Sequence, residues 1–129
     1  MIVTSIYASI LSLLFIFLTI RIIKIRRTNK ISIGDGNNLI LQKAIRAQSN
    51  FCETVPLTLI LFFLAENNGA WFVLLNLLGI LFAIGRASHA YGISQINENF
   101  RFQIFGMVIT FTAITGLSLT NLILIFIKL

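Results

Sequence analysis

Four stretches of the chain carry no charged residue, and they constrain the fold more than any other feature. They cover residues 1–20, 54–65, 67–85 and 102–127. A membrane-spanning helix needs roughly 20 predominantly apolar residues. The first and last stretches meet this length and the third nearly does, but the second is too short to cross by itself. To span a membrane, the second stretch must include the polar residues that precede it.

The composition points to the same environment. Hydrophobic residues make up 57% of the 129 residues and charged residues only 11%, whereas a soluble domain has about 25% charged residues. A chain this small cannot hide such a surplus of apolar side chains from water. We therefore expect an all-α integral membrane protein, a single domain over residues 1–129, with four antiparallel helices at about 2–24, 39–66, 70–90 and 101–127. The first stretch lacks the basic segment and the cleavage site of a signal peptide, so we expect a retained helix.

Basic residues cluster between the first and second expected helices. The cluster contains Arg21, Lys24, Arg26, Arg27, Lys30, Lys43 and Arg46. The positive-inside rule places the basic loops in the cytoplasm and both termini outside it. Topology and contact with anionic lipid headgroups account for this charge. Nucleic-acid binding is disfavoured, because the cations lie directly against a membrane span.

The polar residues ahead of the second apolar stretch share one face of a helix. At about 100° per residue, Arg46, Ser49, Asn50 and Glu53 form one stripe, while Gln48 points elsewhere. A charge at membrane depth costs about 2.5 kcal/mol or more, so such residues face a bundle interior or a wet cavity. Arg46 and Glu53 are separated by about 10.5 Å along the axis, too far for a direct pair. Each therefore needs other partners.

Candidate partners lie at the same depth on other helices. Arg86 and His89 share a face near the end of the third helix, and Arg101 begins the fourth. This layer is cationic, so the guest that suits it is an anion with carboxylates that arginine grips, while Glu53 holds an ammonium group. A lone histidine at a helix end is, alternatively, an ordinary hydrogen-bonding residue. No metal site is expected from one histidine and one cysteine, and Cys52 is expected to pack.

The second helix also carries the most specific motif of the chain. The pattern R-A-Q-x-N-x-x-E-x-x-P is formed by Arg46, Ala47, Gln48, Asn50, Glu53 and Pro56. It resembles the MAPEG family, the membrane-associated proteins in eicosanoid and glutathione metabolism. The similarity runs from about residue 21 to residue 127, and its short bacterial branch is matched by the RR at 26–27, GDGNN at 34–38 and GRASHAYG at 85–92.

The resemblance implies a microsomal glutathione transferase-like protein, a four-helix homotrimer that binds glutathione as co-substrate between subunits. Glutathione-binding positions are matched by Arg46, Gln48, Asn50, Glu53, Arg86 and His89, with Arg26 as a further binding residue. Arg101 matches the arginine that activates the thiol. A nearby guanidinium favours the thiolate by lowering a thiol pKa that starts near 8.5, and the thiolate is the nucleophile. The implied substrate is a lipophilic electrophile arriving from the bilayer.

Some positions depart from the eicosanoid-synthesising members. Ser49 replaces an arginine, Ile93 a tyrosine and Phe102 a serine, which favours general conjugation or peroxidase activity. The alternative is a non-catalytic membrane scaffold of the same fold that binds lipid or another ligand. A small four-span exporter is disfavoured, because the first helix has no carboxylate and Glu53 lies near one end of its helix. We expect a multi-pass protein of a bacterial inner membrane.

Overall fold

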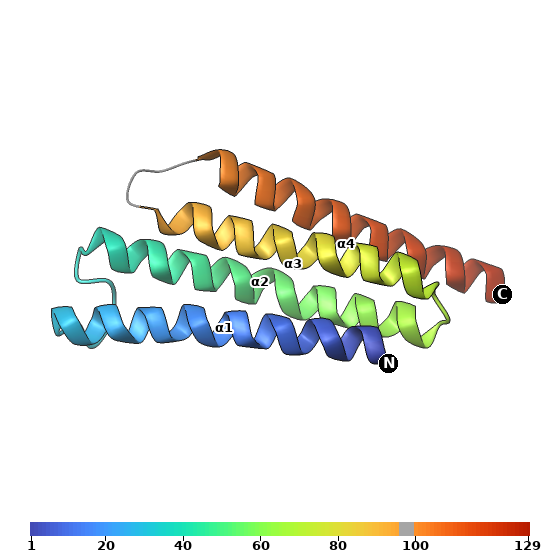
Figure 1. Ribbon diagram of the computed structural model, residues 1–129, viewed down its shortest axis with the longest axis horizontal. Helices are drawn as coiled ribbons and strands as arrows, with labels where there is room; N and C mark the ends of the chain where they lie inside the picture. Colours follow the sequence, from blue (N-terminus) through green and yellow to red (C-terminus); the bar gives the residue numbers. More distant parts are fainter. Residues whose placement is uncertain (96–99) are drawn as a thin grey trace.

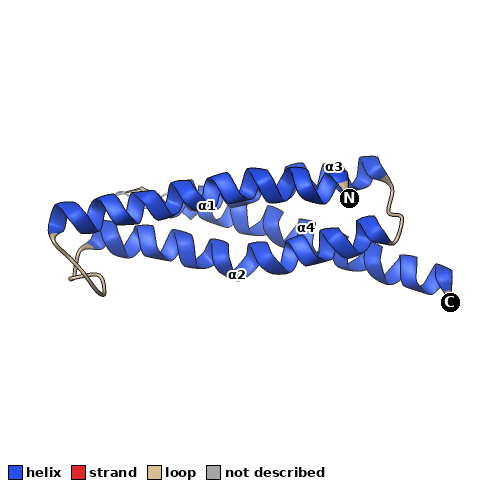
Figure 2. Cartoon of the chain, turned by 90° about the horizontal axis from the view of Figure 1, so that it is seen from below, coloured by secondary structure: helices blue, strands red, loops and turns tan. Residues whose placement is uncertain are grey.

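Four long helices make up the protein. The computed structural model describes residues 1–95 and 100–129, in which the helices are α1 (Ile2–Asn29), α2 (Leu39–Asn67), α3 (Phe72–Ser94) and α4 (Phe100–Lys128). They run antiparallel in chain order, and both termini lie at the same end of the bundle (Figure 1). Only helices and loops occur in these two described segments (Figure 2). Each helix is long and apolar enough to cross a membrane, which confirms the expected all-α membrane bundle.

α1 continues past residue 24, where the sequence predicted its end, because its last turn is closed by a specific cap. Lys30 adopts a left-handed conformation with φ 55°. The Ile31 N–H donates to the Arg26 carbonyl at 3.0 Å, and the Lys30 N–H donates to the Arg27 carbonyl at 3.3 Å. This pair of bonds is a Schellman motif. Two arginines in the last turn also favour the negative end of the helix dipole.

α3 likewise extends beyond the predicted residue 90, to Ser94. Gly92 was expected to lie beyond the helix, but it lies inside it and is buried. A Cβ at Gly92 would lie 2.8 Å from the backbone nitrogen of Gln103 on α4. Glycine is therefore used here for close packing of two helices rather than to end one.

α3 and α4 also pack closely nearer the middle of the bundle. A Cβ at Gly106 would lie 2.6 Å from the His89 nitrogen and 2.7 Å from the Gly85 carbonyl oxygen. A Cβ at Gly85 would lie 2.9 Å from Thr110 Oγ1 and 3.0 Å from the Gly106 carbonyl oxygen. Small residues at a helix interface let backbones approach in this way. The contact fixes α4 against the part of α3 that carries Arg86 and His89.

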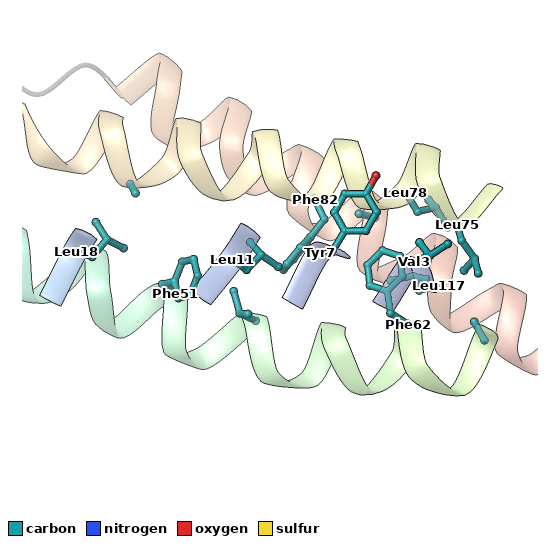
Figure 3. Close-up of a cluster of buried hydrophobic side chains, with 14 of the residues drawn as sticks. Val3, Tyr7, Leu11, Leu18, Phe51, Phe62, Leu75, Leu78, Phe82 and Leu117 are labelled. Atoms are coloured by element: carbon teal, nitrogen blue, oxygen red, sulfur yellow. The ribbon is translucent and has the colours of Figure 1, made fainter. Parts of the chain in front are cut away.

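The apolar core extends between the helices along much of the bundle, from Val3 near the termini to Leu18 (Figure 3). It centres on the ring of Tyr7, which stacks on Phe62 of α2 with centroids 5.7 Å apart. The Tyr7 hydroxyl donates to the Asn76 carbonyl at 3.0 Å, and Gly79 leaves the room that the ring needs. The outward faces of all four helices are apolar and exposed, as suits side chains whose solvent is lipid.

At the terminal end, α2 caps α1. Glu66, in the last turn of α2, accepts hydrogen bonds from the backbone nitrogens of Val3 and Thr4, both at 2.9 Å. Its carboxylate also lies 3.5 Å from the N-terminal ammonium of Met1. The first turn of a helix leaves its N–H groups without partners and favours a negative charge. Here a residue of the next helix meets both needs.

Candidate functional site

A buried arginine connects three helices at the centre of the polar layer. Arg86 of α3 is fully buried, with an exposed fraction of 0%. Its Nη2 donates to Asn50 Oδ1 on α2 at 2.5 Å, and its Nη1 lies 3.5 Å from Thr110 Oγ1 on α4. The Arg86 Nε has no hydrogen-bond partner among the described residues. The guanidinium is thus held from two sides but not fully satisfied.

This arrangement is costly in a membrane-spanning segment. An arginine near the centre of a span is expensive unless carboxylates, carbonyls or water surround it, and Asn50 offers a neutral oxygen. A hydrogen bond to a charged group contributes about 1.5–3 kcal/mol. Asn50 therefore has a defined structural task, because it supplies the short bond that holds Arg86. The predicted role of Arg86 as a direct contact of a guest stays a prediction, since the side chain lies behind Asn50.

His89 follows Arg86 by three residues on α3 and is also buried. Its Nδ1 lies 3.2 Å from the backbone carbonyl of Gln103 on α4, which makes Nδ1 the protonated nitrogen if the ring is neutral. Its Nε2 is buried and has no partner within residues 1–95 and 100–129. A short groove of about 300 Å³, formed by α4 residues and His89, begins at this ring.

The charged ends of the predicted stripe point outward. Arg46 and Glu53 are both exposed, and neither forms a hydrogen bond or ion pair with any described residue of the chain. Arg46 lines a groove of about 400 Å³ between α2, the end of α3 and the start of α4. Lys43 and Gln103 also contribute to this groove. We call this groove, together with Arg46, Asn50 and Glu53, the α2 polar face.

Three further predicted site residues, Gln48, Arg26 and Arg101, lie outside the α2 polar face. Gln48 turns from the stripe toward α1, where its Nε2 donates to Thr19 Oγ1 at 2.7 Å. Arg26 is half-buried near the end of α1, with one terminal nitrogen buried and unpaired in the described part of the chain. Arg101 lies exposed in the first turn of α4. The structure therefore joins Asn50 to Arg86 directly and leaves Gln48 on another contact.

Comparison with known proteins identifies the family of the chain. A family model described as MAPEG matches residues 4–123. The chain belongs to the MAPEG family. It is 32% identical over 120 residues to the inner membrane protein YecN of Escherichia coli K12, and equally to YecN of Escherichia coli O6:H1. In each case the match covers 93% of this chain and 90% of the relative. The family predicted from the motif on the second helix is confirmed.

Two residues that contact Arg86 and His89 were not predicted from the sequence. Thr110 supports Arg86, but threonine is common in membrane helices, where its hydroxyl bonds to its own backbone. Thr110 does so here, donating to the Gly106 carbonyl at 2.7 Å. Gln103 orients His89 through its backbone carbonyl, a contact that no residue type announces. The only indication in the sequence was that Gln103 lies on the same turn of α4 as Arg101, a predicted site residue.

Proposed function

We propose that this protein is a membrane-bound glutathione transferase or peroxidase that holds glutathione at the subunit interfaces of a homotrimer. In this proposal it conjugates or reduces lipophilic electrophiles from the bilayer. The observation that carries the proposal is the α2 polar face: a buried, incompletely satisfied Arg86 held by Asn50, beneath exposed charges of both signs. Membership of the MAPEG family supports it.

The chemistry of the α2 polar face fits glutathione. This tripeptide has two carboxylates, one ammonium group and a thiol, so it needs cations, a carboxylate and hydrogen-bond donors together. Arg46 offers a bidentate grip on a carboxylate, and Glu53 offers an ion pair to the ammonium. The Arg86 Nε and His89 Nε2 are buried polar atoms that lack partners among the residues that the structure describes. The groove of about 400 Å³ beside Arg46 lies within the range of small-molecule sites.

A trimer accounts for the exposure of these charges. Arg46 and Glu53 face outward from a single subunit at a helix depth where contact with lipid is unfavourable. A neighbouring subunit that covers the α2 polar face removes them from lipid and completes a cavity. In this arrangement Gln48 and Arg26 lie at the rim of the same subunit interface or of the neighbouring one.

The proposed chemistry needs a thiolate near Arg101. A guanidinium beside the sulfur favours the ionised form. In conjugation, the thiolate sulfur forms a bond to an electrophilic carbon, and the displaced group or the new carbanion takes a proton. In peroxide reduction, the sulfur attacks the outer peroxide oxygen and an alcohol leaves. A second glutathione then converts the resulting sulfenic acid into glutathione disulfide and water.

The same proposal includes a location. The related YecN is described as an inner membrane protein, and we infer the same membrane for this chain. The basic residues between α1 and α2 then face the cytoplasm by the positive-inside rule, and both termini face the other side. This orientation puts the α2 polar face on the side where glutathione is made and kept reduced.

Calorimetric titration of the purified protein with glutathione in detergent tests the proposal. Arg46→Ala should weaken binding by about tenfold or more, because a charge-assisted contact contributes about 1.5–3 kcal/mol. Arg101→Ala should bind glutathione but lose the thiolate absorbance near 240 nm, a general property of thiolates that rises from about pH 7 to 9. Lys128→Ala removes one charge at the opposite end of the bundle and serves as the control.

The outcomes separate the proposal from its alternative. Wild-type protein that binds no glutathione contradicts the proposal outright. Binding without thiolate and without turnover supports the non-catalytic scaffold. Unchanged conjugation in Arg101→Ala would show that Arg101 has no part in activation, even if glutathione is the ligand.

A further inference from the structure

Two apolar grooves meet at one arginine on the side of α1 away from the α2 polar face. One groove, of about 290 Å³, lies between α1 and α3 and includes Leu18, Ala87 and Ala90. The other, of about 350 Å³, lies between α1 and the start of α2 and includes Lys24 and Ile40. Phe17 and Arg21 line both grooves. We call the pair the twin grooves.

Phe17 and Arg21 form the ridge that separates the twin grooves. They are four residues apart, so they lie one above the other on the same helical face. Phe17 is exposed with a fraction of 64%, and Arg21 is half-buried. The two grooves therefore lie on either side of this ridge, and the groove between α1 and α2 extends past Arg21 toward the end of α1.

Arg21 also lies at a defined depth. The α1 residues before it are uncharged from the start of the helix, and at 1.5 Å per residue they span about 28 Å. The hydrocarbon core of a bilayer is about 30 Å thick. Arg21 is thus at the edge of the hydrocarbon, and Lys24, exposed and three residues further on, reaches the headgroup layer.

The arginine is held in place by α3. Its guanidinium donates to the Ser94 hydroxyl and, at 3.2 Å, to the Ser94 carbonyl. Ser94 in turn donates its hydroxyl to the Ala90 carbonyl at 2.6 Å. These bonds use two of the five donors of a guanidinium. A fixed cation with further donors is left at the headgroup end of the groove between α1 and α3, and midway along the groove between α1 and α2.

We propose that the twin grooves bind one anionic phospholipid, with its phosphate on Arg21 and Lys24, one acyl chain in the groove between α1 and α3, and its glycerol ester region in the groove between α1 and α2. A phospholipid joins an apolar chain to an anionic group through a short ester region, so both its polarity and its charge match. Basic pockets between membrane helices suit anionic headgroups in general. A second copy of this chain is a poorer match, because it has four acidic residues against ten basic ones. The inference is independent of glutathione binding and shares no residue with the α2 polar face.

Native mass spectrometry tests the proposal on the intact protein released from micelles. The micelles contain equal amounts of phosphatidylglycerol and phosphatidylcholine with identical acyl chains. Wild type should retain phosphatidylglycerol in preference. The double variant Arg21→Gln/Lys24→Gln should lower that preference by about 25-fold, at about fivefold for each cation. The matched control Arg27→Gln/Lys30→Gln makes the same chemical changes on exposed residues of the same helix end and should keep it.

Two further variants separate the parts of the site. Lys24→Gln alone leaves the Arg21–Ser94 bonds intact and should lower the preference by about fivefold. Ala87→Phe fills the groove between α1 and α3 without a change of charge, and it should lower retention of phosphatidylglycerol. Inorganic phosphate at millimolar concentration should not displace the lipid, because it has no chains to place in the grooves.

Each opposite result overturns the proposal. An equal loss in the Arg27→Gln/Lys30→Gln control shows attraction to the whole basic surface instead of a site. An unchanged preference in Lys24→Gln would show that Lys24 does not contact the phosphate. Unchanged retention in Ala87→Phe would show that no acyl chain lies in the groove between α1 and α3. Displacement by inorganic phosphate identifies a plain anion site. A change of oligomeric state in Ala87→Phe, with no change in lipid retention, assigns this face to a second copy of the chain.

Discussion

The close approach of α3 and α4 at Gly106 makes a sharp prediction for the substitution Gly106→Ala. The new Cβ would lie 2.6 Å from the His89 nitrogen and 2.7 Å from the Gly85 carbonyl oxygen. Both are backbone atoms, so no side-chain rotation relieves the contact and the helices must separate. Overpacking of this kind costs about 1–3 kcal/mol, while alanine in place of glycine within a helix returns about 0.5–1 kcal/mol. We expect a net loss of about 1–2 kcal/mol in the free energy of unfolding.

Gly116→Ala on the same helix is the matched control. Its Cβ would meet Leu78 Cδ2 at 2.9 Å, but this atom is the tip of a flexible side chain that can move aside. The helix-propensity gain then dominates, and we expect stability equal to wild type or higher by up to about 1 kcal/mol.

Unfolding in mixed micelles with increasing SDS, followed by circular dichroism, measures the free energy of unfolding of wild type and both variants. The difference between Gly106→Ala and Gly116→Ala should reach about 2 kcal/mol. Equal stability of the two variants would refute the argument, because they share the residue change and the helix and differ only in the atoms that a Cβ meets.

Three other predictions follow from contacts in the bundle. Glu66→Gln should lower the free energy of unfolding by about 1 kcal/mol, because an amide keeps only part of the cap on α1 and has no charge. Hydrogen exchange of the amides in the first turn of α1 should become faster, and unchanged exchange would contradict this role of Glu66. Asn50→Leu should cost about 1.5–3 kcal/mol by leaving Arg86 without its short bond, and an SDS unfolding curve like that of wild type would argue against this bond. Gly79→Ala should destabilise strongly because its Cβ would overlap the Tyr7 ring, and adding Tyr7→Leu should restore part of the loss in a double-mutant cycle.

The architecture was readable from the sequence because membrane spans depend on length and apolarity. Uncharged stretches predicted all four helices, and the second reached the length of a span by including the polar residues before it, as the structure shows. The helix ends were less predictable. α1 ends at a lysine in a left-handed conformation, where the usual glycine signal is absent. The end of α3 was also placed too early, because Gly92 lies inside the helix, where it allows a close helix–helix contact.

The candidate site was predictable on α2 and less so elsewhere. Helical periodicity placed Asn50 on the same face as Arg46 and Glu53, and shared depth suggested Arg86 as a partner. Which atoms meet is a matter of helix rotation, which one sequence does not fix. The support from Thr110 depends on how closely α4 approaches α3, and therefore on Gly85 and Gly106. A contact of this kind depends on the packing of the whole bundle, so it could not be predicted from the residue types alone.

The cap that Glu66 places on α1 has a consequence for how the chain is made. The first turn of α1 has no side-chain cap of its own and no acidic residue, and among the described residues the amides of Val3 and Thr4 are met by Glu66, more than sixty positions later. During synthesis α1 leaves the ribosome before Glu66 does. We therefore expect the leading turn of α1 to stay frayed until α2 has crossed back through the bilayer and its last turn reaches α1. A nascent chain truncated before Glu66 should expose that turn to protease, and one extended past it should protect it.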